Sequence, residues 1–151
     1  KASHQLGKFN VFADLQYRMV FYQANSIKFN DVNDTFRFFN PKAGITYQQK
    51  NMFYFSSIAI ANKEPNRDDF EASQTEQPKK EQLIDWESGV EFKKNKFLLN
   101  ANFYYMYYRD QLVLTGKIND VGAYTRTNVP NSYRAGIELQ LKYSLNKKYS
   151  I

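Results

Sequence analysis

Hydrophobic and polar residues alternate with a period of two along much of the chain. The clearest stretch is Phe97–Asp110 (FLLNANFYYMYYRD), in which the odd positions from Phe97 to Tyr107 carry no charge and the even positions are mostly polar. Successive side chains of a β-strand point to opposite faces, so this pattern predicts a strand with one apolar and one hydrated face. The strand is about twice as long as the five or six residues usual in globular proteins. Tyr133–Leu145 repeats the pattern and is predicted to be its return strand.

Five other segments are predicted to be strands. They are Lys8–Tyr22, Thr35–Gln49, Met52–Asn62, Leu83–Lys93 and a last strand that begins at Tyr149. In Met52–Asn62 the alternation is weak, and either face could be the apolar one. Pro41 cannot donate a ladder hydrogen bond, so we expect it near a strand end or a bulge. Because the chain begins at a lysine and stops just after a strand begins, we expect it to be a piece of a longer protein.

The connections between the predicted strands alternate between long and short. The long connections are residues 23–34, 63–82 and 111–130, and the short turns are at 50–51, 94–96 and 146–148. The third long connection contains a candidate hairpin, Leu112–Thr115 with Ala123–Asn128. In an up-and-down sheet this order places every long loop at one rim, as in outer-membrane barrels. We therefore predict an all-β fold, an antiparallel up-and-down meander of long strands that forms a segment of a transmembrane β-barrel.

Composition limits the chemistry that the chain can perform. The absence of cysteine excludes disulfides and thiolate metal sites, and the net charge of +6 permits an anionic partner without naming one. The 12 tyrosines and 13 phenylalanines favour strands. His4, the one histidine, lies in a polar N-terminal segment, where a solvated side chain is more common than a general base or a ligand. We therefore expect no enzyme, no metal site and no cofactor.

The order of several short motifs resembles that of the TonB-dependent outer-membrane receptors. In that family a strand with Pro-x-x-Gly precedes a Tyr/Ser-rich strand and a Pro-containing loop. A Glu-x-Gly strand, an aromatic strand ending in Tyr-Arg-Asp and a Gly-x-Glu strand follow. The corresponding residues here are Pro41/Gly44, Tyr54/Ser56, Pro65, Glu87/Gly89, Tyr108-Arg109-Asp110 and Gly136/Glu138.

The resemblance implies a receptor that imports a scarce nutrient through the outer membrane of a Gram-negative bacterium. The nutrient would be a ferric siderophore, a corrinoid or an oligosaccharide. Such a receptor has an N-terminal plug, a segment that engages a TonB-type energy-transducing protein, and a barrel of about 22 strands. Residues 1–151 would then be one partial barrel domain, without the plug and the remaining strands. The implied partners are outer-membrane lipid, the TonB-type protein and the small nutrient.

Residues that could bind the nutrient are expected on the rim with the long loops, because functional residues concentrate on loops. We select Arg67, Tyr104, Tyr108 and Arg126. The segment Arg67-Asp68-Asp69 is most simply a solvated loop tip. Asp85, Glu87 and Glu91 share one strand face, and we interpret them as a hydrated inner wall that faces the plug.

Two other classes of protein fit parts of the pattern. A soluble β-barrel or β-sandwich that binds a small ligand would also alternate apolar and polar residues, with the apolar face turned inward. A nucleic-acid-binding module would need a stripe of basic residues. Here acidic and basic residues are interleaved over several strands, so we expect no nucleic-acid partner.

Overall fold

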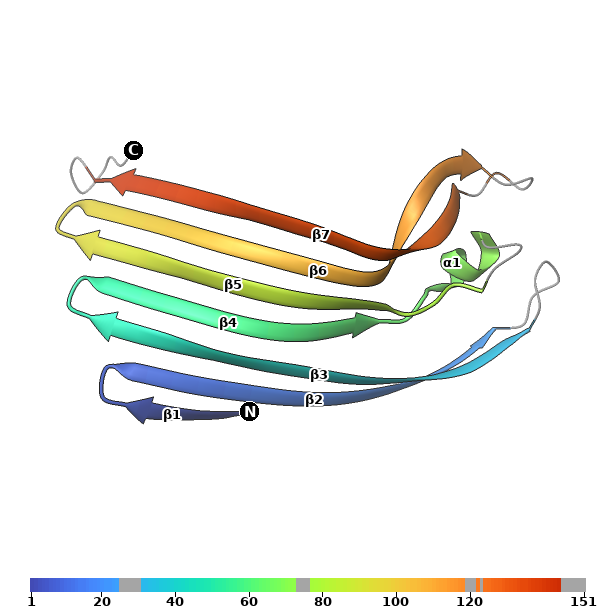
Figure 1. Cartoon of the computed structure of the whole chain (residues 1–151), viewed down its shortest axis with the longest axis horizontal. Helices are drawn as coiled ribbons and strands as arrows, with labels where there is room; N and C mark the ends of the chain where they lie inside the picture. Colours follow the sequence, from blue (N-terminus) through green and yellow to red (C-terminus); the bar gives the residue numbers. More distant parts are fainter. Residues whose placement is uncertain (25–30, 73–76, 119–121, 123, 145–151) are drawn as a thin grey trace.

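The strands form a single antiparallel sheet in which each strand pairs with the next one along the chain (Figure 1). The computed structural model describes residues 1–24, 31–72, 77–118, 122 and 124–144. Within these residues the sheet has seven strands, in the order β1 to β7. The strands are β1 (Ala2–Leu6), β2 (Phe9–Ala24), β3 (Val32–Gln49), β4 (Met52–Lys63), β5 (Glu81–Lys94), β6 (Phe97–Ile118) and β7 (Tyr124–Tyr143). The predicted meander of long strands is confirmed.

The first strand was not predicted from the sequence. Ala2–Leu6 has no alternating pattern and all its side chains are exposed, but it pairs with β2 from Ala2↔Ala13 to Leu6↔Phe9. An edge strand of this kind forms because β2 offers unpaired backbone groups. The predicted last strand, from Tyr149, lies outside the described residues.

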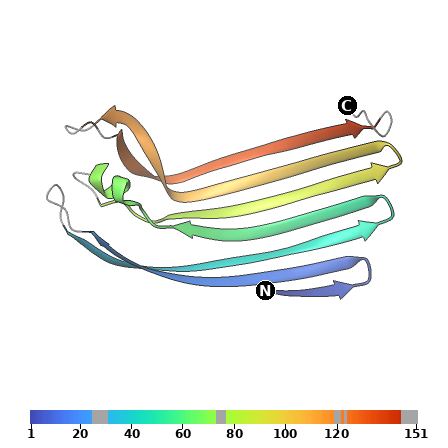
Figure 2. The same ribbon diagram turned by 180° about the vertical axis from the view of Figure 1, so that it is seen from behind.

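The last hairpin is longer than its predicted strands. β6 continues beyond Asp110 to Ile118, and β7 already begins at Tyr124. This extension contains the predicted hairpin, since Leu112 pairs with Asn128; residue 123 lies outside the described part. Asp110 has a positive φ of 51°, and the ladder has a second irregularity between Leu114 and Ile118. The end of the hairpin therefore bends away from the line of the sheet (Figures 1 and 2).

The second long connection contains a short helix where we expected only loop. Helix α1 spans Arg67–Ala72. It begins at Asn66, whose side-chain Oδ1 accepts the backbone N–H of Asp69 at 2.9 Å, while Asp69 Oδ2 accepts the N–H of Asn66 at 2.7 Å. This reciprocal pair satisfies two N–H groups at the helix start, in the manner of a capping box. No described helix is both long and apolar enough to cross a membrane.

Pro41 lies within β3 and not near its end, contrary to the prediction. It pairs with Leu15 on the β2 side, but the ladder to β4 ends one residue away, at Lys42↔Ala59. Beyond that point the side-chain amide of Asn62 donates to the carbonyl of Phe39 at 3.2 Å. Proline is therefore tolerated because β3 has lost its β4 partner there.

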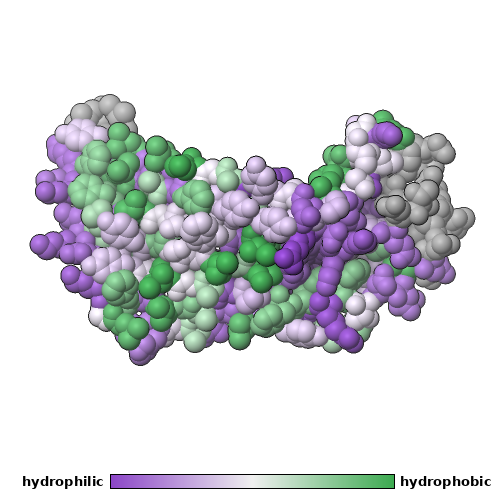
Figure 3. All heavy atoms as spheres, in the orientation of Figure 1, coloured by the Kyte–Doolittle hydropathy of each residue, from purple (hydrophilic) through white to green (hydrophobic). Residues whose placement is uncertain are grey.

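One face of the sheet is apolar and exposed. Ile137, Leu139 and Leu141 of β7 share it with Leu15 and Phe21 of β2. The register also resolves β4, whose faces the sequence left open. Large exposed side chains on this face are Phe9, Leu15, Tyr17, Met19, Phe21, Phe39, Ile45, Tyr54, Ile58, Trp86, Tyr105, Tyr133, Ile137, Leu139, Leu141 and Tyr143. Figure 3 shows hydrophobic and intermediate residues over the middle of the strands and hydrophilic residues toward both ends.

The short turns are staggered by two residues from one hairpin to the next. Phe9 begins β2 and is aligned, strand by strand, with Ala101, whereas Met52 begins β4 and is aligned with Leu99. β6, the third strand that begins after a short turn, starts at Phe97, two residues before Leu99. The end of the sheet therefore shifts by one residue per strand, which is about 3.3 Å along the strand for each spacing of about 4.8 Å between neighbouring strands. If the turns lie in one plane, the strands incline about 35° to its normal, as in closed barrels.

Candidate functional site

The best-packed region lies where the second long connection folds onto the polar face of β2 and β3. Among the described hydrophobic residues, those that are buried are Val32, Phe38 and Phe70. Phe70 of α1 stacks on Tyr22 of β2 at a centroid distance of 5.1 Å. Phe38 is 1% exposed and lies beneath the guanidinium of Arg18, 4.8 Å from its ring. The long-loop rim therefore has a small core of its own.

Helix α1 is tied to β7 by a buried charge pair. Arg126 Nη1 donates to Asp69 Oδ1 at 2.9 Å, and the Asp69 side chain is fully buried. Its second oxygen is the one that accepts the N–H of Asn66. The interpretation of residues 67–69 as a solvated tip is therefore wrong for Asp69, which caps α1 and anchors it to Arg126. Losing one partner of such a pair leaves an uncompensated buried charge.

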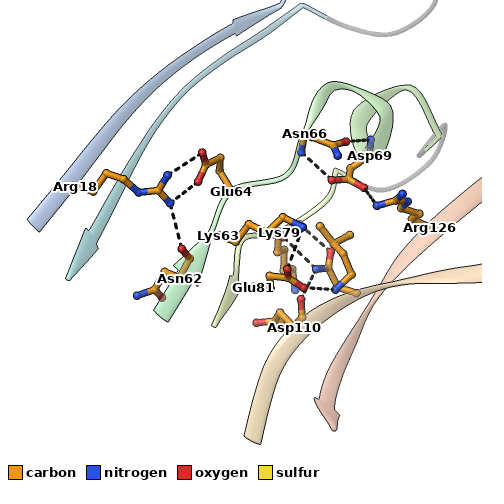
Figure 4. A network of polar contacts seen from close by, with 12 residues as sticks. Arg18, Asn62, Lys63, Glu64, Asn66, Asp69, Lys79, Glu81, Asp110 and Arg126 are labelled. Carbon is orange, nitrogen blue, oxygen red and sulfur yellow. Dashed lines mark hydrogen bonds and ion pairs between the residues drawn. The ribbon is translucent and has the colours of Figure 1, made fainter. Parts of the chain in front are cut away.

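A second tie connects the same segment to β2 (Figure 4). Arg18 donates to both carboxylate oxygens of Glu64, at 3.1 and 2.7 Å, and to the carbonyl of Asn62 at 3.1 Å. The two parallel bonds fix the geometry as well as the charge. Segment 64–72 is thus held from β2 on one side and from β7 on the other.

Two further contacts hold the start of β5 against the last hairpin. Glu81 forms an ion pair with Lys63 at 3.3 Å and accepts the N–H of Leu112 at 3.0 Å. Asn128 exchanges two hydrogen bonds with the backbone of Lys79 and donates to the carbonyl of Asp110 at 2.6 Å. The side chain of Asn128 thereby supplies partners at the point where β6 bends.

The polar face of β5–β7 carries a cluster of carboxylates. Glu87 and Glu138 line a pocket of about 380 Å³ together with Tyr104 and Arg134. One carboxylate oxygen of Asp85, on the same face, is buried and has no hydrogen-bond partner within the described residues. The shared face predicted for Asp85, Glu87 and Glu91 agrees with their alternate positions along β5. This surface suits a cationic or hydrogen-donating partner.

Aromatic rings lie over glycines on the same polar face. A Cβ added to Gly136 would come within 2.5 Å of the hydroxyl of Tyr104, which lies directly opposite on β6. Phe12 covers Gly44 and Phe55 covers Gly89 in the same way. Each hairpin that carries a long loop therefore has one such pair, which fixes the ring against its neighbouring strand.

The four candidate ligand-binding residues do not converge on one point. Tyr104 and Tyr108 lie on the polar face of β6, and the ring of Tyr108 is 5.5 Å from the guanidinium of Arg134. Arg67 is exposed at the start of α1. Arg126 is already engaged by Asp69. The sequence analysis did not predict the ion pairs of Arg18 with Glu64 and of Asp69 with Arg126. The helix start at Asn66-x-x-Asp69 has a recognisable spacing and could have been predicted.

Comparison with protein families gives one match. The family described as "TonB dependent receptor-like, beta-barrel" matches residues 5–151. A comparison with curated protein sequences gives no match.

Solved structures give matches over most of the chain. They include the FrpB iron transporter from Neisseria meningitidis (19% identity, 95% of this chain and 22% of that one, TM-score 0.70). The copper transporter OprC also matches, with 16% identity over 93% of this chain and 25% of that one and a TM-score of 0.70. The siderophore receptor PirA from Acinetobacter baumannii matches with 18% identity over 93% of this chain and 24% of that one and a TM-score of 0.62. The chain thus spans about a quarter of each, and at these identities the likeness shows the fold.

Proposed function

This chain belongs to the TonB-dependent receptor-like β-barrel family. We propose that it forms part of the wall and the rim of a nutrient-importing receptor in the outer membrane of a Gram-negative bacterium. The sheet is a segment of a transmembrane β-barrel. The longer protein that would contain it, here called the parent receptor, also supplies a plug and the segment that engages a TonB-type protein. We propose no catalytic role for the chain.

The observation that carries this proposal is the height of the exposed apolar face. On β6 this face runs from Phe97 to Tyr107, which is ten residue steps. Ten steps cover about 33 Å along the strand and, at an inclination of about 35°, about 27 Å along the membrane normal. The apolar band of outer-membrane barrels is about 25 Å high.

The exposure of this face argues against a soluble β-domain. A soluble sandwich or small barrel turns its apolar face inward, onto a second layer. Here Leu139 is 74% exposed, and α1 and its segment pack on the opposite, polar face. Lipid is the partner that covers such a face in a barrel wall.

For the cargo we propose an iron- or copper-containing nutrient such as a ferric siderophore, ahead of an oligosaccharide or a corrinoid. The support is that the similar solved structures carry the names of an iron transporter, a copper transporter and a siderophore receptor. Arg67, Tyr104, Tyr108 and Arg126 remain our proposed contacts. Of these, Tyr104 and Tyr108 lie on the face that becomes the inside of the barrel, along the path a solute would take.

We also propose that the carboxylate wall contacts the plug. On the inner face Glu138 lies at mid-height, level with Asn102, and Glu87 and Asp85 follow at two-residue intervals toward the long loops. Carboxylates there would receive N–H donors or cations from a domain that fills the lumen. The unsatisfied oxygen of Asp85 is the most specific indication of such a donor.

Uptake of a radiolabelled ferric siderophore into cells that produce the parent receptor tests this proposal. Substituting both Tyr104 and Tyr108 by alanine should lower uptake, while Tyr133→Ala on the lipid-facing side is the matched control. Uptake should also stop when the inner-membrane potential is collapsed. Uptake that persists without the potential would refute active transport, and equal effects of the inner and outer tyrosines would refute the proposed path.

A further inference from the structure

The apolar face ends at the same level on four neighbouring strands. The row formed by Ile60, Ile84, Tyr107 and Tyr133 is followed, two residue steps toward the long loops and on the same face, by a row of polar residues. This polar row consists of Asn62, Gln82, Arg109 and Asn131. The change from one row to the next marks the level at which the wall leaves the hydrocarbon and meets the lipid head groups.

Tyrosines lie directly below this polar row. Tyr105 and Tyr133 stack at a centroid distance of 6.1 Å, and the hydroxyl of Tyr107 donates to Asn131 Oδ1 at 2.7 Å. Such side chains have an apolar ring and a polar tip, which suits the boundary between hydrocarbon and head groups.

A pocket of about 370 Å³ opens at this boundary. It is lined by Lys79, Lys80, Gln82, Arg109 and Asp110. The guanidinium of Arg109 lies 5.9 Å from the ring of Tyr107, and the ammonium of Lys80 lies 5.9 Å from the ring of Phe38. Phe38 belongs to the polar face, so the ammonium of Lys80 is directed to that side; Arg109 and Lys79 against Asp110 still leave the pocket with a net positive charge.

The cations of this pocket differ from those that hold segment 64–72 and the start of β5. Arg18, Lys63 and Arg126 each form an ion pair with a carboxylate. No such pair is formed by Arg109 or Lys79 within the residues that the structure describes. Among the described residues, the cations beside α1 are thus neutralised by carboxylates, whereas Arg109 and Lys79 keep their positive charge at the head-group level.

The same face also carries an apolar groove of about 550 Å³. Its lipid-side lining is Val11, Ala43, Ile45, Ser56, Ile58 and Trp86. The small side chains of Ala43 and Ser56 leave the space, and Trp86 Nε1 donates to Ser56 Oγ at 3.1 Å. Trp86 and Arg109 lie on adjacent strands, four residue steps apart along the strand direction, or about 13 Å. An acyl chain is long enough to reach the groove from a head group at Arg109.

We propose that this surface binds an anionic membrane lipid, with its phosphate at Arg109 and Lys79 and an acyl chain along the groove. The guanidinium of Arg109 supplies paired donors to two phosphate oxygens, and the ammonium of Lys79 supplies a point charge. Asp110 lowers the net charge of the pocket but does not cancel it. The inference rests on the membrane placement in the proposed function and goes beyond the transport that it assigns.

Native mass spectrometry of the parent receptor, released from neutral detergent after incubation with phosphatidylglycerol, tests this site. The double variant Arg109→Gln/Lys79→Gln should weaken lipid binding by about 30-fold, since each basic residue near an anionic lipid surface contributes about a factor of five. Arg134→Gln removes a charge from the inner face, three residue steps below Arg109, and should leave lipid binding unchanged. Folding of each variant is judged by its mobility on gels before and after heating. If the double variant does not fold, the two single variants are measured in its place.

Two further measurements distinguish an anionic lipid from a neutral lipid and from free phosphate. Phosphatidylcholine, which carries the same phosphate without net charge, should bind more weakly than phosphatidylglycerol. Millimolar inorganic phosphate should not displace the bound lipid. Displacement by phosphate, equal binding of the two lipids, or equal loss in the double and Arg134→Gln variants would each overturn the proposal. Nutrient uptake, measured in parallel, tells whether the transport proposal stands when lipid binding fails.

Discussion

Placing a lysine at Leu139 tests the lipid-facing orientation of the apolar surface. Leu139 is 74% exposed, and its row includes Ala101, Val90 and Tyr54. On β6 that row is four steps from Phe97 and six from Tyr107, which correspond to about 11 and about 16 Å along the membrane normal. A lysine side chain is too short to bring its ammonium to either boundary, so the charge stays in hydrocarbon.

The expected cost is about 2–4 kcal/mol in the free energy of unfolding, the range for a lysine near the midplane of a barrel wall. The parent receptor, folded into phosphatidylcholine vesicles, would be unfolded with urea and followed by tryptophan fluorescence. Trp86 lies on the same lipid-facing surface and supplies a signal from this segment. Leu139→Ala measures how much of the loss comes from the missing side chain alone.

The next residue along β7 supplies the matched control. Gln140 points to the polar face, where its Oε1 accepts the amide of Asn100 at 3.1 Å. Gln140→Lys adds the same charge to the same strand but on the hydrated side, so it should cost well under about 1 kcal/mol, the usual value of an exposed hydrogen bond. If the two lysine variants unfold with equal free energies, the assignment of the two faces is refuted.

Three other changes follow from the same geometry. Asp69→Asn should loosen segment 64–72 and raise its rate of amide hydrogen exchange, since it removes the charge that pairs with Arg126; unchanged protection would contradict the anchoring role. Gly136→Ala should destabilise the barrel by about 1–3 kcal/mol in urea unfolding through collision with Tyr104, and Tyr104→Ala in the same chain should recover part of the loss. On intact cells, antibodies to tags in residues 63–82 and 111–130 should bind, whereas access only at residues 50–51 and 94–96 would mean that the topology is inverted.

Local chemistry was enough to determine the meander and the orientation of its clearest strands. Alternation over Phe97–Tyr107 and Tyr133–Tyr143 is a property of neighbouring residues, and the short turns join strands that must then be antiparallel. The same applies to the order of long and short connections. These features require no knowledge of what packs on what, so they could be read from the chain.

The pairing register between strands decided which residues face the lipid where the alternation of apolar and polar residues was ambiguous. β4 has apolar residues on both faces, and only its pairing with β5, through Ile58↔Trp86 and Tyr54↔Val90, assigns its lipid-facing side. β1 has no pattern of its own and is a strand because β2 has backbone groups to pair. Strand pairing is a contact between segments, and a single segment does not contain it.

The rim was decided by contacts between residues far apart in sequence. Asp69 and Arg126 are 57 residues apart, and Arg18 and Glu64 are 46 apart. Arg126 was selected as a loop cation, and its ion pair with the buried carboxylate of Asp69 could not be read from the residues around it. Whether a charged side chain is free depends on which charges the chain brings beside it, and that is a property of the tertiary structure.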